Sequence, residues 1–302
     1  MKITKSDEDK MKFYIVDVFA EEKYAGNQLA VIRSAKGVSD ETMQALAREM
    51  GYSETTFILR DTPSNGGFDV RIFTPVEELP FAGHPTLGTA YIIQQAIIGQ
   101  PVKNVTLNLG VGQIPVKINY TNNEPAELWM HQKTPDFGAV FQLDALAAVL
   151  NLHTDDIDPR FPIEDVSTGL PFIIVPLRNK DAVERCKINI DAYHALVETS
   201  RAKAIFVFCP EAQHPQNDLH SRMFAHHLGI VEDPATGSAN GCLAGYLVKH
   251  RYFGSDRIDV RVEQGYQINR PSLLLLRAEA NQDIIDVYVG GGVIKVAEGE
   301  LL

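Results

Sequence analysis

Alternation of apolar and polar residues predicts a chain built mainly of short strands. Between residues 68 and 73, the apolar side chains of Phe68, Val70 and Ile72 alternate with polar ones, as in a strand buried on one face. Other stretches are also strand-like, at residues 13–19, 29–33, 105–109, 113–118 and 127–131. We therefore expect sheets, with a few helices between the strands.

Residues 39–51 have the pattern of a helix. Ser39 is a preferred N-cap residue, and Gly51 is a typical residue for ending a helix. Apolar residues recur between them at helical spacing, at Met43, Leu46, Ala47 and Met50. Glu54 is therefore predicted to lie just after the end of a helix.

A second helix is expected from Pro85 onward. Proline suits the first turn of a helix, and the residues that follow are apolar on every side. A helix with so little polar surface is predicted to be largely buried.

The segment that begins at Pro85 has a counterpart in the second half of the chain. Residues 85–90 and 234–239 share the pattern P-x-x-G-[TS]-A at an offset of 149 residues. Two further pairs of segments recur in the same order, 26–32 with 169–175 and 71–73 with 222–224. These echoes favour a duplicated unit, although chance agreement among short apolar strings is the alternative. Ligands often bind between such halves, so we expect the two segments to face one another across a cleft.

The first turn of a helix favours a bound anion, because its backbone N–H groups are unpaired and carry partial positive charge. A carboxylate is the natural ligand. Small residues in the two segments would allow a ligand close to the backbone, namely Gly83, Gly88, Gly237, Ser238 and Ala239. The alternative is that these residues only permit close packing of the helices.

His84 and Asp233 each stand one residue before the proline of their segment, which gives them the same offset of 149. A titratable group at each place could donate or accept a proton over a bound ligand. The alternative is that both are N-cap residues, a role for which Asp is suited and His is not.

Composition and charge restrict the partners. The formal net charge of -11, without any run of Lys and Arg, argues against nucleic acid and favours a small molecule. Since no stretch approaches about 18 consecutive apolar residues and the N-terminus has no apolar signal core, we expect a cytoplasmic protein without a membrane partner. The three scattered cysteines suggest neither disulfides nor a zinc site. Residues 1–10 are expected to be a polar extension outside the fold.

Several motifs together resemble the phenazine-biosynthesis (PhzF-like) family, whose fold is that of diaminopimelate epimerase. They occur in order along nearly the whole chain: DVFAEEKYAGNQLAV at 17–31, SETTF at 53–57, RIFTPVEELPFAGHPTLGTA at 71–90, VSTGLPF at 166–172, EDPATGSA at 232–239 and VYVGGGVIKVAEGEL at 287–301. One departure is Asn269 in NRPS, where family members often have glycine.

The resemblance implies an α+β fold of two similar epimerase-like domains, each a barrel-like mixed sheet around a central helix, related by a pseudo-two-fold axis. We expect the first domain at residues 1–122 with 284–302 and the second at 123–283. It also implies a homodimer and an isomerase that uses neither metal nor organic cofactor. In the phenazine-pathway member, the enzyme isomerises 2,3-dihydro-3-hydroxyanthranilate by moving a proton between ring carbons.

By the same resemblance, Glu54 in SETTF is the acid–base residue, assisted by His84, Asp233 and Ser238. Substrate binding is assigned to residues of the same motifs, namely Asn27, Ser53, Gly83, Thr236, Gly237 and Ala239. Taken alone, Glu54 is better explained as an exposed residue at a helix-to-strand junction, and the resemblance reverses this interpretation. The carboxylate would instead have to be partly withdrawn from water to keep the proton it moves.

Epimerases of this fold use two facing cysteines, whereas this chain has His84 and the segment from Asp233 to Ser238 at the corresponding places. Cys242 lies four residues beyond Ser238, about one helical turn away. Racemisation by a thiol pair is therefore not expected. The alternative function is an inactive member of the fold that binds a small molecule or a protein. The sequence leaves open the substrate, the stereochemistry and any contribution of the dimer to the site.

Overall fold

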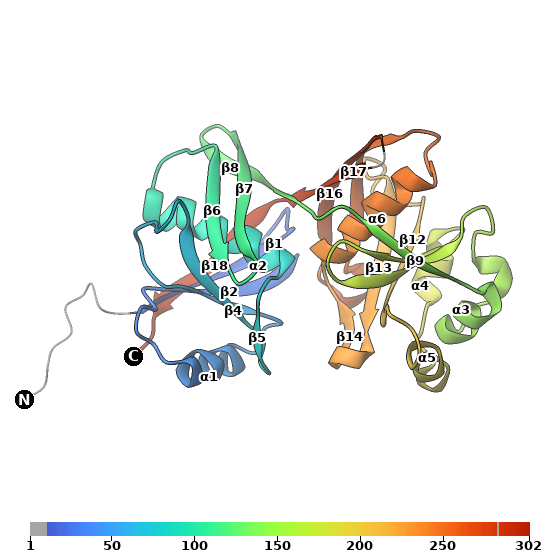
Figure 1. Ribbon diagram of the computed structural model, residues 1–302, viewed down its shortest axis with the longest axis horizontal. Helices are drawn as coiled ribbons and strands as arrows, with labels where there is room; N and C mark the ends of the chain where they lie inside the picture. The colour runs from blue at the N-terminus through green and yellow to red at the C-terminus, as the bar shows by residue number, and fades with distance from the viewer. Residues whose placement is uncertain (1–10, 283) are drawn as a thin grey trace, which may run out of the picture. The chain divides into compact units, whose positions relative to one another are not determined.

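The computed structural model describes residues 11–282 and 284–302, so the predicted extension at 1–10 lies outside the described residues. The chain divides into two compact units (Figure 1): unit 1 comprises residues 11–130 with Gly291–Leu302, and unit 2 comprises 131–290 apart from 283. These limits differ from the expected ones at 122/123 and 283/284. The expected limits fall inside two hairpins whose strands pair antiparallel.

Unit 1 is a mixed sheet with helices inside and outside it. Its elements are β1 (Lys12–Val18), β2 (Asn27–Arg33), α1 (Asp40–Met50), β3 (Thr55–Ile58), β4 (Phe68–Phe73), β5 (Glu78–Leu79), α2 (Gly83–Ile92) with a π-helical turn at Ile93–Ile98, β6 (Asn104–Leu109), β7 (Gly112–Thr121), β8 (Glu124–His131) and β18 (Val293–Glu300). Neighbouring strands pair in the order β18-β1-β2-β3-β4-β6-β7-β8, and β5 also pairs with β4. The pairs β2–β3 and β4–β6 are parallel and the others are antiparallel.

Unit 2 repeats this topology. Its elements are β9 (Asp136–Phe141), α3 (Leu143–Leu150), β10 (Ile163–Ser167), β11 (Pro171–Pro176), α4 (Lys180–Arg185), α5 (Ile190–Val197), β12 (Ala204–Cys209), β13 (Leu219–Ala225), β14 (Ile230–Asp233), α6 (Gly237–Lys249), β15 (Arg257–Gln264), β16 (Ser272–Asn281) and β17 (Ile284–Gly291), with 3₁₀ turns at Thr154–Asp156, His226–Leu228 and Tyr266–Ile268. The order is β9-β10-β11-β12-β13-β15-β16-β17, with β14 on β13.

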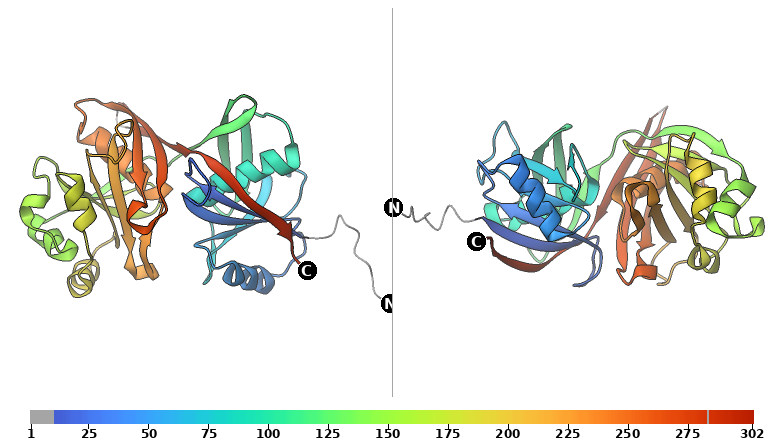
Figure 2. Two further views of the ribbon diagram at one scale, coloured as in Figure 1. Left: turned by 180° about the vertical axis from the view of Figure 1, so that it is seen from behind. Right: turned by 90° about the horizontal axis from the view of Figure 1, so that it is seen from below.

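Among the described residues of unit 2, the parallel pairs are again two, β11–β12 and β13–β15, at the places of β2–β3 and β4–β6. The predicted duplication is thus present in the strand order and directions. One strand differs in origin: β18, which borders β1 in unit 1, comes from the C-terminal end of the chain, whereas β9, which borders β10, is the first strand of unit 2 in the sequence (Figure 2).

The predicted apolar helices are the central helices of their units. Helix α2 contacts strands β1, β2, β3, β6, β7 and β18, and α6 contacts β10, β11, β15 and β16. Nearly every residue of both helices is buried, which explains why their sequences have almost no polar face. No helix in the described part of the chain combines the length and apolar character required to span a bilayer.

Helix α1 lies on the outside of unit 1, against β3 and β4 (Figure 1). Its limits agree with the prediction. The Ser39 side chain accepts a hydrogen bond from the Thr42 N–H, and Gly51 adopts the left-handed conformation with a φ of 69° while its N–H donates to Ala47. Both helix ends are therefore fixed by local sequence, and Glu54 follows three residues later, directly before β3.

Candidate functional site

Glu54 is largely withdrawn from solvent. Its side chain is 16% exposed, although it sits in the short connection between α1 and β3. The alternative of an ordinary exposed glutamate at a helix-to-strand junction therefore does not hold. Burial of a carboxyl group that can carry charge is costly, so such a residue is a candidate for chemistry.

His84 lies against Glu54 in unit 1. The distance from His84 Nε2 to Glu54 Oε2 is 3.4 Å, and the imidazole is 8% exposed. His84 is the second residue of α2, and the strand that follows Glu54 is tied to this helix by a buried 2.7 Å hydrogen bond between the hydroxyls of Thr56 and Thr89. The contact between β3 and α2 thus holds the two titratable groups together.

The imidazole of His84 is neutral at ordinary pH. Burial lowers the pKa of His84 to about 3, and a hydrogen bond with the backbone of Gln28 opposes this only in part. A backbone group that favours the protonated ring must be a carbonyl, which accepts a hydrogen bond. Since Nε2 makes no hydrogen bond within the described residues, we assign the donor role toward Gln28 to Nδ1. The Nε2 atom that faces Glu54 therefore carries a lone pair.

In unit 2, Asp233 and Thr236 form the turn that leads into α6. Asp233 is the last residue of β14 and is buried. The Thr236 hydroxyl donates a hydrogen bond to Asp233 Oδ2, and the buried Gln264 side chain donates to the backbone carbonyl of Asp233 over 2.9 Å. Ser238, one residue inside α6, is partly buried.

The expected equivalence of His84 with Asp233 is wrong by five residues. Helices α2 and α6 start at Gly83 and Gly237, and their N-cap residues are Ala82 and Thr236. The correspondence is thus at an offset of 154, which pairs His84 with Ser238 and Asp233 with Leu79. Pro85 lies inside its helix, whereas Pro234 lies before α6, so the shared P-x-x-G-[TS]-A letters do not mark the same structure.

Packing around the two turns agrees with the offset of 154. Gly110 directly follows β6, and a Cβ at this position would lie 2.9 Å from Pro80 in the turn before α2. Gly265 directly follows β15, and a Cβ at this position would lie 2.6 Å from Pro234 in the turn before α6. Inside the helices, the Thr86 hydroxyl donates to the N-cap carbonyl of Ala82, and the Asn240 amide donates likewise to Thr236. Pro80 is therefore the structural counterpart of Pro234.

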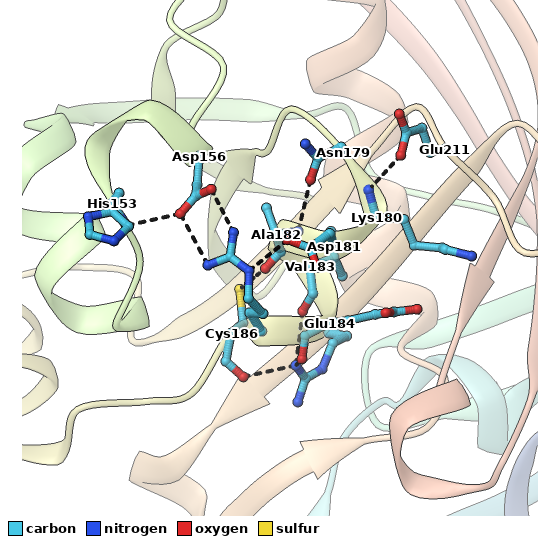
Figure 3. Close-up of polar contacts among 12 residues, drawn as sticks. His153, Asp156, Asn179, Lys180, Asp181, Ala182, Val183, Glu184, Cys186 and Glu211 are labelled. Carbon is cyan, nitrogen blue, oxygen red and sulfur yellow. Dashed lines mark hydrogen bonds and ion pairs between the residues drawn. The ribbon is translucent and has the colours of Figure 1, made fainter.

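The echo of Arg71 in Arg222 does mark equivalent places. Arg71 pairs with Glu78 at 2.6 Å and Arg222 with Glu232 at 2.8 Å, both across the hairpin that leads to the central helix. Arg222 also donates to carbonyls at the end of α4, those of Val183 and Cys186. Figure 3 shows these two residues, together with the α4 residues Lys180, Asp181, Ala182 and Glu184. This shared Arg–Glu pair anchors both hairpins, so it serves the scaffold.

Neither His84 nor Asp233 acts as a helix N-cap, since neither occupies the cap position and neither helix has a side-chain cap. The packing alternative holds for Gly88, because a Cβ there would lie 2.6 Å from Leu29 and 2.9 Å from Val18 in the sheet. Gly88 therefore faces the strands of unit 1, not a ligand.

The expected substrate-binding residues fall into two groups by unit. In unit 1, Asn27 is buried at the start of β2, Ser53 is half-buried beside Glu54, and Gly83 begins α2. In unit 2, Thr236 precedes α6, and Gly237 and Ala239 are buried within it. Sequence reasoning missed Gln28, Thr56, Thr89 and Gln264, because their contacts join residues distant in sequence and leave no local pattern.

Cys242 is unsuited to acid–base chemistry. It is fully buried in α6, where burial raises the pKa of its thiol to about 12. The thiol is therefore protonated at ordinary pH.

Comparison with known proteins identifies the family. The family model for phenazine biosynthesis-like protein, PhzC-PhzF, matches residues 16–299. An uncharacterized isomerase of Clostridium acetobutylicum is 30% identical over 97% of this chain and 98% of its own length. The trans-2,3-dihydro-3-hydroxyanthranilate isomerase of Pseudomonas aeruginosa is 35% identical over 95% and 98% of the two chains.

Solved structures give the same result for the fold. A Bacillus anthracis phenazine biosynthesis protein of the PhzF family superposes with a TM-score of 0.88 at 27% identity, covering 97% of this chain and 99% of that one. A hydroxyproline epimerase from Agrobacterium vitis superposes with a TM-score of 0.59 at 9% identity, covering 97% and 91%, which shows the fold alone. The epimerase-like α+β fold expected from the sequence is confirmed, and the chain belongs to the phenazine biosynthesis-like (PhzC-PhzF) family.

Proposed function

We propose that this protein is an isomerase that moves a proton between carbon atoms of a small carboxylate-bearing substrate, with Glu54 as the acid–base residue. The observation that carries the proposal is the pairing of Glu54 with His84 at 3.4 Å, away from solvent, at the start of the central helix of unit 1. The names of the relatives support the reaction class, since both the characterised and the uncharacterised ones are isomerases.

In this proposal, the Glu54 carboxylate removes a proton from one substrate carbon and returns the same proton to another. Between the two steps the carboxyl group is neutral and the substrate holds the electron pair released from the carbon–hydrogen bond. Limited access of water keeps the proton from being lost during this interval. The low exposure of Glu54 supports this requirement.

His84 is well suited to stabilise the protonated form of Glu54. Its Nε2 lone pair faces Glu54 Oε2, so it accepts a hydrogen bond once the carboxyl group has gained the substrate proton. A charged imidazolium would instead stabilise the carboxylate and oppose proton uptake. Burial of His84 therefore favours the step in which Glu54 acts as a base.

The duplicated scaffold provides this acid only once. In unit 1, Thr55 pairs with Phe73, and Ile205 pairs with Phe224 at the same place in unit 2. Glu54 is the residue before Thr55 and Ala204 is the residue before Ile205. Ala204 is therefore the counterpart of Glu54. This position therefore has no acid–base residue in unit 2 to match Glu54 in unit 1, so the two units do not supply one base for each side of a carbon atom here. One group that both removes and returns the proton fits an isomerase better than a two-base epimerase.

Further parts of the proposal concern the substrate and the assembly. The uncapped first turns of α2 and α6 offer backbone N–H groups that suit a substrate carboxylate. We assign Asp233 and Ser238 to the same reaction from their place in the turn before α6 and in its first turn. The proposed enzyme uses no metal or organic cofactor and acts in the cytoplasm as a homodimer.

The direct test is turnover of trans-2,3-dihydro-3-hydroxyanthranilate, followed by NMR and mass spectrometry after dialysis against a chelator. The proposal predicts a product of unchanged mass with a hydrogen moved to a different carbon. A panel of other small cyclic and acyclic carboxylates extends the test to related substrates. Absence of any isomer and of any carbon-bound hydrogen exchange across this panel would reject the proposed function.

A further inference from the structure

Gln264 makes a closed set of hydrogen bonds with the turn that precedes α6. Its side chain is fully buried at the end of β15. The amide nitrogen donates to the Asp233 carbonyl at 2.9 Å and to Thr236 Oγ1 at 3.1 Å, and the amide oxygen accepts from the Thr236 N–H at 3.2 Å. The Asn240 side chain also donates to the amide oxygen, at 3.0 Å.

These partners fix the orientation of the Gln264 amide. A backbone carbonyl can only accept a hydrogen bond and a backbone N–H can only donate one, so the amide oxygen must face Thr236 N and the nitrogen must face the Asp233 carbonyl. The nitrogen therefore also donates to the Thr236 hydroxyl. A hydroxyl has one proton, and that of Thr236 is consequently directed to Asp233 Oδ2.

The fold itself does not require this set of polar contacts, as unit 1 demonstrates. Strand pairing aligns β6 of unit 1 with β15 of unit 2. Leu107 of β6 pairs with Phe68, and at the same place in unit 2 Val262 of β15 pairs with Leu219. Two residues further along these strands, Leu109 is the counterpart of Gln264. In the turn, Leu79 is the counterpart of Asp233, and Ala82 is the counterpart of Thr236. Unit 1 builds the equivalent turn with three apolar residues, so the polar residues of unit 2 serve another purpose.

We propose that Gln264 is a positioning residue that acts through Thr236: it directs the Thr236 hydroxyl so that the Asp233 carboxylate is held in one orientation. A hydrogen bond to an ionised group is strong, so it fixes this orientation well. The oriented carboxylate accepts a hydrogen bond from a donor group of the substrate, such as an amine or a hydroxyl. This role rests on the proposed function, and it adds Gln264 to the residues on which turnover depends.

The test uses the full-length protein with the variants Gln264→Leu and Thr236→Ala, which introduce the residues that unit 1 has at these places. We expect kcat to fall by about tenfold to a hundredfold while KM stays within about threefold. Thr236→Ser keeps the hydroxyl and is expected to restore kcat to within about threefold of the parent protein. A matched control is Gln267→Leu, a glutamine of unit 2 that contacts His220 and lies outside this set.

An NMR measurement without substrate separates this proposal from the proposed function. In the parent protein, the Thr236 hydroxyl proton should be protected from solvent exchange, and Gln264→Leu should abolish this protection while thermal unfolding remains cooperative. Retention of the protected proton in Gln264→Leu would overturn the assignment. Unchanged kcat in a Gln264→Leu protein that has lost the protected proton would overturn it as well. If the parent protein shows no turnover, the proposed function fails, and the NMR result still decides whether Gln264 orients Thr236.

Discussion

His84 Nε2 lies 3.4 Å from Glu54 Oε2, and both side chains are mostly shielded from solvent. Burial lowers the pKa of His84 from 6.5 to about 3, so the folded protein resists protonation that the unfolded chain accepts. The stability that this neutral histidine contributes is present above about pH 6.5 and is lost as the pH falls toward about 3. We predict that His84→Gln reduces the slope of unfolding free energy against pH in this window, by up to about 1.4 kcal/mol per pH unit.

Urea unfolding of both proteins between pH 4 and pH 7 measures this slope. His131→Gln is the matched control, because it makes the same substitution at a histidine that is about half exposed. An equal slope in the parent protein and in His84→Gln would contradict a buried neutral imidazole at this position.

Gly88 gives a prediction about packing. A Cβ at this position would lie 2.6 Å from Leu29 Cδ2 and 2.9 Å from Val18 Cγ2, where α2 meets the sheet of unit 1. Gly88→Ala should therefore lower the free energy of unfolding by about 1–3 kcal/mol through overpacking. Denaturant titration checks this, with Gly99→Ala as a contrast, since Gly99 has open space but a φ of 68°. A fully stable Gly88→Ala protein with weakened substrate binding would favour the ligand-approach role instead.

Cys242 tests whether a thiol takes part in the reaction. Its thiol is buried and protonated because burial raises its pKa to about 12. Cys242→Ala should retain kcat/KM within about threefold and should lose only the stability expected for a small cavity, about 1 kcal/mol. Steady-state kinetics with the substrate of the isomerase assay provide the measurement. Loss of turnover by more than a hundredfold in a folded Cys242→Ala protein would restore a thiol mechanism.

Local features of the chain were predictable from sequence. The limits of α1 follow from Ser39 and Gly51, which satisfy backbone groups within one turn of the helix. The strand at Phe68–Phe73 has the predicted limits, because alternation records directly which face is buried. The buried central helices were also foreseen, since a helix without a polar face has to be enclosed.

Correspondence between the two halves was harder to predict. Matching letters aligned Pro85 with Pro234, but the equivalent proline is Pro80, whose contact with Gly110 appears only when β6 returns beside the turn. The contact of Glu54 with His84 likewise depends on β3 and α2 meeting in space. Such relationships are set by the pairing of distant strands, and a local sequence pattern does not record them.

In the proposed reaction, Glu54 carries the proton between substrate carbons. The decisive measurement is turnover, in ordinary water, of substrate that carries deuterium at the carbon that loses its proton, comparing the parent protein with Glu54→Gln, which keeps the size of the side chain and removes its acid–base group. We predict that the parent protein delivers this deuterium to the second carbon, and that the rate of transfer falls at least about a hundredfold in Glu54→Gln, with unchanged thermal unfolding. Equal rates of deuterium transfer by the two proteins, or a parent product that has lost the deuterium to water, would contradict this role of Glu54.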